Sequence, residues 1–254
     1  MEIKRITSTQ NEYIKKIAKL SSKKYREEAG LFIAEGEHLV EMVLASSFEI
    51  QSVIMSDSYY DKNNINFECE TILVTDNIFS KISDTKTPQG VIAVVKMADV
   101  EGSITQGRYI YCDNLQDPGN IGTIIRTADA FSFDGVIMSE GSADIYSPKV
   151  IRSSQGSVFN IKIIRSGNIN LLKNMKNKDF MLTSTAIYEK SIELKSMKVL
   201  KNHIFVIGNE GSGVSKEILD MSDEIAYIPM TGKAESLNAG VAASILMYEV
   251  AERE

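Results

Sequence analysis

Polar, glycine-containing segments in the second half of the chain hold residues whose types and spacing could do chemistry. The first, DNLQDPGNIGTIIRTA, runs from Asp113 to Ala128 and joins an apolar run to a helical pattern through a Pro-Gly turn. A helix that opens near Asn120 has free backbone N–H groups and a positive dipole end, which together can hold an anion. Arg126 adds a permanent cation to the same helix. An ordinary turn in which Asn120 is the N-cap also fits this pattern, and for this segment taken alone it is the preferred interpretation.

The second segment, FVIGNEGSGV from Phe205 to Val214, places glycines directly after an apolar run. Glycine has no Cβ, so the backbone here can approach a ligand closely. No Lys-Ser or Lys-Thr pair follows the glycines, so the segment is not a Walker A phosphate loop. Its order, G-x-x-G-x-G, reverses the dinucleotide fingerprint and argues against a Rossmann cofactor site.

The third segment, IPMTGKAESLNAGVAA from Ile228 to Ala243, leads from an apolar run into the last helix. Small residues in its second half allow that helix to pack closely against a neighbour. Ser236 is either the N-cap of the helix or part of a site, and the residues alone leave both possibilities open.

Strand and helix patterns alternate through the part of the chain that contains these segments. Alternation of this kind predicts a parallel α/β sheet with crossover helices. Each segment follows a predicted strand, and the carboxyl ends of strands are where open α/β sheets gather their ligand sites. The expected strands are 108–112, 135–139, 180–183, 203–207 and 225–228, and the expected helices are at about 120–131, 169–177, 213–221 and 236–252.

The first hundred residues have the pattern of a separate, smaller α/β domain. The polar stretch 96–107 contains two glycines and loses all periodicity, so we place the domain boundary there. The expected domains are therefore 1–98 and 106–254. Within the first, we expect one amphipathic basic helix over 11–25, a second helix around 37–45, and strands at 52–55, 71–74 and 91–95.

Positive charge is concentrated at the N-terminus of a chain that is acidic overall. The net charge is −6, but residues 1–26 carry +6, which leaves −12 for the remainder. Such a cluster fits either contact with nucleic-acid phosphates or a solvated charged face. The candidates for phosphate contact are Lys15, Lys16, Lys19, Lys23 and Arg26.

Composition excludes several other classes of protein. An apolar fraction of 43% with 24% charged residues is that of a globular protein, and no run of 18 apolar residues or secretory signal is present, so we expect a cytoplasmic protein without a membrane span. Cys69 and Cys112 form no C-x-x-C pair, and the chain has only two histidines. We therefore expect no disulfide framework, no metal site and no Ser/His/Asp triad.

The three segments jointly resemble the signature motifs of the SpoU/TrmH branch of the SPOUT methyltransferases. The resemblance rests on the strings N-x-G-x-I-x-R-T-A, G-N-E-G-x-G and I-P-M-x-G-x-x-x-S-L-N and spans residues 108–251. Residues 6–36 look like the small RNA-binding domain, similar to ribosomal protein L30e, that precedes the catalytic domain in many members. The resemblance implies a C-terminal trefoil knot, which periodicity alone would miss because knots are rare exceptions to the connection rules.

The resemblance also implies an activity, the S-adenosylmethionine-dependent methylation of an RNA ribose 2′-oxygen. Arg126 matches the catalytic arginine of the family. Because a guanidinium has a pKa above roughly 12, we expect it to stabilise the developing alkoxide and an adjacent phosphate rather than to act as a base. The matching cofactor-binding positions are Gly208, Ile228, Met230 and Leu237, and the other catalytic positions are Asn120, Glu210, Ser236 and Asn238.

The expected partners are RNA and a second copy of the chain. Ribosomal RNA is the first choice over tRNA, because the N-terminal domain resembles that of ribosomal-RNA enzymes, and Lys149 and Arg152 match a stretch that lies near RNA in the family. The main alternative function is a catalytically inactive, knot-fold RNA-binding or ribosome assembly factor. A SPOUT base methyltransferase would lack the S-L-N motif, and a dinucleotide enzyme is opposed by the glycine order.

Overall fold

The chain forms two compact units in the computed structural model, which describes residues 3–98, 104–188 and 190–253. Residues 99–103 of the expected domain boundary lie outside the described residues. One unit contains Met1–Asp99 together with Asp144–Phe159, and the other contains Val100–Ala143 together with Asn160–Glu254. The segment 144–159 therefore groups with the N-terminal residues, whereas the sequence placed it in a continuous domain over 106–254.

A buried ion pair and an aromatic stack account for this grouping. The guanidinium of Arg26 lies 2.6 Å from the carboxylate of Asp144, and both side chains are less than a tenth exposed. The Phe32 and Tyr146 rings stack with their centroids 4.5 Å apart. Burial of these groups holds the segment against the first unit.

The first unit is built on a mixed five-stranded sheet in the order β1-β4-β3-β5-β2. Strands β1, β4 and β3 run parallel, whereas β5 is antiparallel to both β3 and β2. Isoleucine and valine side chains from the sheet and helices form its core. The strands are Lys4–Ile6 (β1), Leu31–Glu35 (β2), Ile50–Ser56 (β3), Thr71–Val74 (β4) and Val91–Lys96 (β5). The helices are Glu12–Lys19 (α1), Lys23–Ala29 (α2), Glu37–Leu44 (α3), Asp57–Asn63 (α4), Asp76–Ile82 (α5) and Pro148–Ser153 (α7), with a 3₁₀ turn at Ser157–Phe159 (η1).

The single basic helix expected over 11–25 is wrong, because the chain turns at Leu20. Asn11 caps α1 by accepting hydrogen bonds from the backbone N–H groups of Tyr13 and Ile14. The Leu20 side chain is buried, and α2 begins only after Ser22. Lys23 therefore belongs to a different helix from the lysines of α1.

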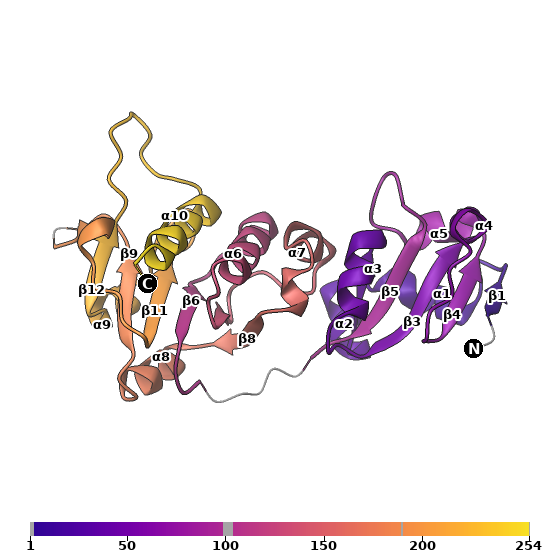
Figure 1. Ribbon diagram of the computed structural model, residues 1–254, viewed down its shortest axis with the longest axis horizontal. Helices are drawn as coiled ribbons and strands as arrows, with labels where there is room; N and C mark the ends of the chain where they lie inside the picture. The colour runs from indigo at the N-terminus through magenta and orange to yellow at the C-terminus, as the bar shows by residue number, and fades with distance from the viewer. Residues whose placement is uncertain (1–2, 99–103, 189, 254) are drawn as a thin grey trace. The chain divides into compact units, whose positions relative to one another are not determined.

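The second unit has a seven-stranded sheet in the order β10-β12-β9-β11-β6-β7-β8, and every adjacent pair is parallel. This confirms the α/β fold class. Helix α10 lies beside α6 (Figure 1). The strands are Arg108–Cys112 (β6), Gly135–Ser139 (β7), Lys162–Gly167 (β8), Met181–Thr185 (β9), Ile192–Glu193 (β10), His203–Ile207 (β11) and Glu224–Tyr227 (β12). The helices are Pro118–Ala130 (α6), Ile169–Lys176 (α8), Lys216–Met221 (α9) and Ala239–Ala251 (α10), with a 3₁₀ turn at Leu194–Ser196 (η2).

The described helices include none that combines the length and apolar character needed to cross a membrane.

His203 lies fully buried at the start of the central strand β11. Its Nδ1 atom accepts from the backbone N–H of Leu200 (3.3 Å), and its Nε2 atom is 2.8 Å from the hydroxyl of Thr183. These contacts fit a neutral ring whose Nε2–H donates to Thr183. Burial, helped by the charge of Arg108, lowers the pKa of His203 to about 3.

His203 should make the stability of this protein fall as the pH drops below about 6.5. The unfolded chain protonates this residue near pH 6.5 but the folded chain only near pH 3, so the unfolded state binds more protons between these values. The free energy of unfolding should therefore fall by up to about 1.4 kcal/mol per pH unit from this residue alone. Denaturant titrations at several pH values between 7.5 and 5 give the free energy of unfolding as a function of pH. This free energy should fall less steeply with decreasing pH for His203→Gln than for the unaltered protein. Equal pH dependence of the two proteins would contradict this account.

Candidate functional site

A cavity of about 630 Å³ opens at the carboxyl ends of β9, β11 and β12 in the second unit. Its walls come from the loops that follow these strands and from the start of α10. All four residues expected to bind the cofactor line it, namely Gly208, Ile228, Met230 and Leu237. Three expected catalytic residues line it as well, namely Glu210, Ser236 and Asn238. The second and third sequence segments thus meet in one place.

The glycine loop after β11 is closed by its own backbone. Asn209 and Gly213 exchange both backbone hydrogen bonds, and the Asn209 side-chain oxygen accepts from the N–H groups of Gly211 and Ser212. A Cβ atom on Gly208 would overlap the backbone of Gly213 and Val214. Glycine is therefore required at 208 for the loop to fold back over the cavity.

Glu210 ties the second segment to the first. Its carboxylate accepts hydrogen bonds from the Asn120 side chain (2.9 Å) and from the backbone N–H groups of Asp117 (3.1 Å) and Gln116 (3.2 Å). Partial burial acts to raise the pKa of Glu210, but these hydrogen bonds outweigh it and hold the pKa below its ordinary value. Glu210 therefore stays ionised and braces the two loops.

The opening of α6 is occupied by the protein itself. The N-cap is Asp117 rather than Asn120, and its carboxylate accepts from the N–H groups of Gly119 (2.7 Å) and Asn120 (3.0 Å). An anion-binding role for this helix end is therefore not supported, because the free donors already face a negative charge. Asn120 is buried and donates its side-chain amide to Glu210.

The N-cap of α10 is Asn238 and not Ser236. The Asn238 side chain accepts from the backbone N–H of Val241 (3.2 Å), while Ser236 is exposed in the preceding loop. That loop, between β12 and α10, extends away from the sheet (Figure 1). Ser236 is one of the residues that line the cavity.

Arg126 lies on α6 with an exposed side chain and does not line the cavity. Within the described part of the chain its guanidinium has no ion-pair or hydrogen-bond partner. Arg126 is therefore not a surface arginine held by a glutamate of its own helix.

Sequence reasoning missed one wall of the cavity. The cavity is also lined by residues 185–188, which are the last residue of β9 and the three that follow it. Ile187 and Tyr188 are 72% and 58% exposed. These residues carry no polar motif. The one signal that could have found them is their position after a parallel strand next to β11.

The lysines expected to contact RNA are exposed, but the expected role of Arg26 is wrong. Arg26 is 3% exposed and pairs with Asp144, and its Nη1 atom donates to the carbonyl oxygens of Leu20 (2.7 Å) and Ser21 (2.8 Å). A buried guanidinium with these partners cannot reach a phosphate. Lys15, Lys16, Lys19 and Lys23 are all on the surface.

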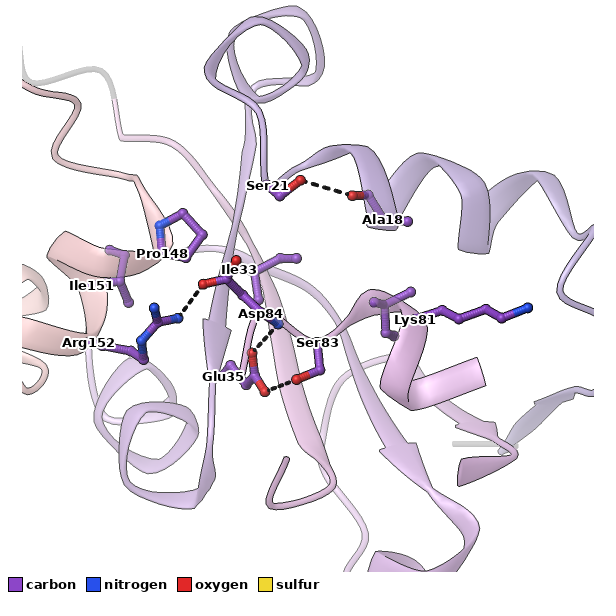
Figure 2. Close-up of a pocket in the computed structure, with 11 residues that line it drawn as sticks. Ala18, Ser21, Ile33, Glu35, Lys81, Ser83, Asp84, Pro148, Ile151 and Arg152 are labelled. Atoms are coloured by element: carbon purple, nitrogen blue, oxygen red, sulfur yellow. Dashed lines mark hydrogen bonds and ion pairs between the residues drawn. The ribbon is translucent and has the colours of Figure 1, made fainter. Parts of the chain in front are cut away.

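Lys149 and Arg152 lie on α7, which packs in the first unit. Lys149 is exposed. The Arg152 guanidinium is paired with the carboxylate of Asp84 at 2.7 Å, beside a cavity of about 180 Å³ (Figure 2). Glu35 accepts from the Ser83 hydroxyl and the Asp84 N–H in the same cavity (Figure 2). An RNA phosphate would have to compete with Asp84 for Arg152.

Comparison with protein families gives two adjacent matches. Residues 107–248 match the SpoU rRNA Methylase family, and residues 11–93 match the MRM3-like substrate binding domain. One match falls in each expected domain, and the polar stretch between the two domains is matched by neither family.

Individual relatives are similar to this chain over nearly its whole length. The chain is 34% identical, over 98% of its length and 99% of the relative's, to the 23S rRNA (guanosine(2553)-2′-O)-methyltransferase RlmP of Bacillus subtilis (strain 168). An rRNA methyltransferase from Sinorhizobium meliloti, solved with S-adenosylmethionine bound, has a TM-score of 0.88 at 28% identity, covering 99% of this chain and 98% of that one. The SpoU methyltransferase AviRb of Streptomyces viridochromogenes has a TM-score of 0.84 at 25% identity, covering 96% and 97%.

Gly208→Ala should disrupt the cavity, because the added methyl group overlaps the backbone of the glycine loop. We expect a lower melting temperature and loss of the thermal stabilisation that S-adenosylmethionine gives to the unaltered protein. Gly211→Ala is the matched control, since its Cβ would lie 3.6 Å from the nearest atom, an ordinary van der Waals distance. Differential scanning fluorimetry with and without S-adenosylmethionine makes the comparison. Equal behaviour of the two variants would contradict the proposed role of Gly208.

Proposed function

Because the chain belongs to the SpoU rRNA methylase family, we propose that the RNA it methylates is ribosomal RNA. The chain is an S-adenosylmethionine-dependent RNA ribose 2′-O-methyltransferase. The choice of ribosomal RNA over tRNA is supported by the RlmP relative, which acts on 23S rRNA and is similar over its full length. A ribosomal substrate in turn supports a cytoplasmic location. The three relatives described above are all named as methyltransferases, which argues against the inactive RNA-binding alternative.

The cavity after β9, β11 and β12 has the size and lining that S-adenosylmethionine requires. Its volume of about 630 Å³ lies within the range of small-molecule sites, and its lining combines apolar residues such as Ile228 and Leu237 with polar residues such as Asn209. Closure of the loop at Gly208 brings backbone rather than side chain to the cavity. When bound, S-adenosylmethionine supplies the methyl group. The convergence of two sequence motifs on this one cavity is the observation that carries the proposal.

We assign Arg126 an electrostatic role at the ribose. A 2′-hydroxyl gains negative charge as it loses its proton, and a fixed guanidinium stabilises that charge and an adjacent phosphate. Arg126 is suited to this role because it is exposed and has no ion-pair partner in the part of the chain that the structure describes. Its position outside the cavity wall fits contact with RNA rather than with the cofactor.

The remaining polar residues fall into two roles. Glu210 and Asn120 hydrogen-bond to each other, so we assign them to holding the loops in place rather than to contact with the ribose. Asn238 caps α10 and fixes the end of the third segment. Ser236 lines the cavity, is exposed and has no hydrogen-bond partner among the residues that the structure describes, so we assign it to orienting the ribose.

The purified protein should transfer methyl groups from S-adenosylmethionine to ribosomal RNA isolated from cells that lack its gene. Mapping of 2′-O-methylated riboses should then find a position that is modified in normal cells and missing from the deletion strain. Arg126→Ala should lower transfer by at least a hundredfold, because charge stabilisation of this kind is worth roughly 10²–10³ in rate. Calorimetry should give unchanged cofactor affinity for the variant. Modification of tRNA alone would refute the ribosomal assignment, and loss of cofactor binding would refute the role of Arg126.

We also propose that the protein is a homodimer and that its C-terminal part is knotted. Val241, Ile245 and Tyr248 form an apolar stripe on α10, spaced by four and three residues and 46%, 37% and 52% exposed. An exposed stripe of this kind on a helix fits burial against a second copy. The knot is supported by the chain path, since the chain leaves the middle of the sheet at β11, passes to β12 beyond β9, and returns to pack α10 on α6.

Ile245→Asp should dissociate the dimer, because it buries a charge in the apolar stripe. Light scattering at micromolar concentration should give twice the chain mass of 28.2 kDa for the unaltered protein and the single-chain mass for the variant. Leu200→Asp is the control, since Leu200 is similarly exposed, at 46%, and is not part of α10. A monomeric unaltered protein, or a dimeric Ile245→Asp variant, would contradict the proposal.

A further inference from the structure

The turn between α1 and α2 creates a groove that the sequence pattern did not predict. Because the chain reverses at Leu20, the ring of Tyr25 on α2 folds back towards the lysines of α1. The groove has a volume of about 360 Å³. It is lined by Glu12, Lys15, Lys16, Lys19, Leu20, Tyr25, Glu28 and Ala29.

Both acidic side chains of this groove are already paired with lysines. Glu12 lies 3.0 Å from the ammonium group of Lys15, and Glu28 lies 3.9 Å from that of Lys24. Lys16 and Lys19 have no ion-pair partner among the residues that the structure describes. Positive charge therefore remains uncompensated along the α1 wall.

The Tyr25 ring is the aromatic surface of the groove. It is 37% exposed, and the ammonium groups of Lys19 and Lys24 lie 5.2 Å and 5.9 Å from its centroid. Leu20 and Ala29 provide apolar contacts beside it. An exposed ring bordered by cations is the combination that single-stranded nucleic acids favour, since a base stacks on the ring while lysines contact the backbone. Paired bases in an RNA duplex are stacked on each other and cannot reach such a ring.

We propose that the α1–α2 groove binds an unpaired nucleotide of the RNA substrate, with its base stacked on Tyr25 and its phosphate held by Lys16 and Lys19. This inference rests on the proposed RNA substrate. It adds that part of this RNA is unpaired where the N-terminal unit binds it. The volume of the groove accommodates one nucleotide, so it acts as a single-nucleotide clamp outside the methyl-transfer cavity. Stacking is tolerant of base identity, so the clamp selects unpaired RNA rather than a particular sequence.

The full-length protein should bind a labelled single-stranded RNA oligonucleotide through Tyr25. In fluorescence anisotropy, Tyr25→Leu should weaken that binding roughly five- to hundredfold, the effect expected when one base-stacking ring is removed. Tyr25→Phe keeps the ring and should bind within about twofold of the unaltered protein. Tyr60→Leu, on α4 and outside the groove, is the matched control. Binding of the same sequence as a duplex should not respond to Tyr25→Leu.

Two further measurements keep the inference testable if Tyr25→Leu folds poorly. Ultraviolet cross-linking of the unaltered protein to RNA containing 4-thiouridine should place an adduct on Tyr25. The double variant Lys16→Gln, Lys19→Gln should have a shallower slope of log binding constant against log salt concentration, by about 0.7 for each phosphate that it no longer neutralises.

Three results would overturn the inference. Tyr25→Leu could bind the single strand as tightly as the unaltered protein does, it could weaken single-strand and duplex binding equally, or the adducts could lie only on other residues. If the ribosomal assignment is wrong, the protein will not methylate rRNA. The comparison of oligonucleotide binding between Tyr25→Leu and the unaltered protein still tests the groove in that case.

Discussion

The carboxylate of Glu210 is the contact on which the candidate site depends. It accepts one side-chain and two backbone hydrogen bonds from the segment that leads into α6, so it joins loops that lie about ninety residues apart in the chain. Hydrogen bonds to a charged acceptor are about twice as strong as neutral ones, and leaving their donors unpaired carries a penalty. Two further bonds act in the same direction, from the Asn209 amide to the Asn114 carbonyl and from the Ser215 N–H to the Asp113 carboxylate. Together they fix both loops at one end of the sheet.

The parallel order of the strands makes these contacts possible. β11 pairs with β6 in register, so Ile207 lies opposite Cys112 and both chains leave the sheet at the same level. The loops that follow them therefore begin side by side, and the third segment approaches from β12 on the other side of β9. Apolar side chains on both faces of the sheet are buried, so the sheet forms a fixed framework for the polar residues of the motifs.

Much of this architecture could be predicted from the sequence, because it depends on local patterns. Strands such as 108–112 and 203–207 have the predicted bounds, and the residues at 208, 228, 230 and 237 share one cavity as the family motifs implied. The failures involve distant partners. Arg26 had the pattern of a surface cation, but its position is decided by Asp144, 118 residues later. The end of α1 at Leu20 likewise depends on burial of that side chain, and no periodicity signals it.

The buried pair of Arg26 and Asp144 also has a consequence for the order in which the chain can mature. The N-terminal unit includes residues 144–159, which follow the first strands and α6 of the other unit in the chain. During synthesis, domains usually fold as units and the N-terminal one folds first. Here the N-terminal unit must wait until the ribosome has released residues well beyond its own sheet. A nascent chain that ends before residue 144 carries an uncompensated guanidinium at a site built to bury it. Completion of the first unit is thereby linked to the synthesis of part of the second.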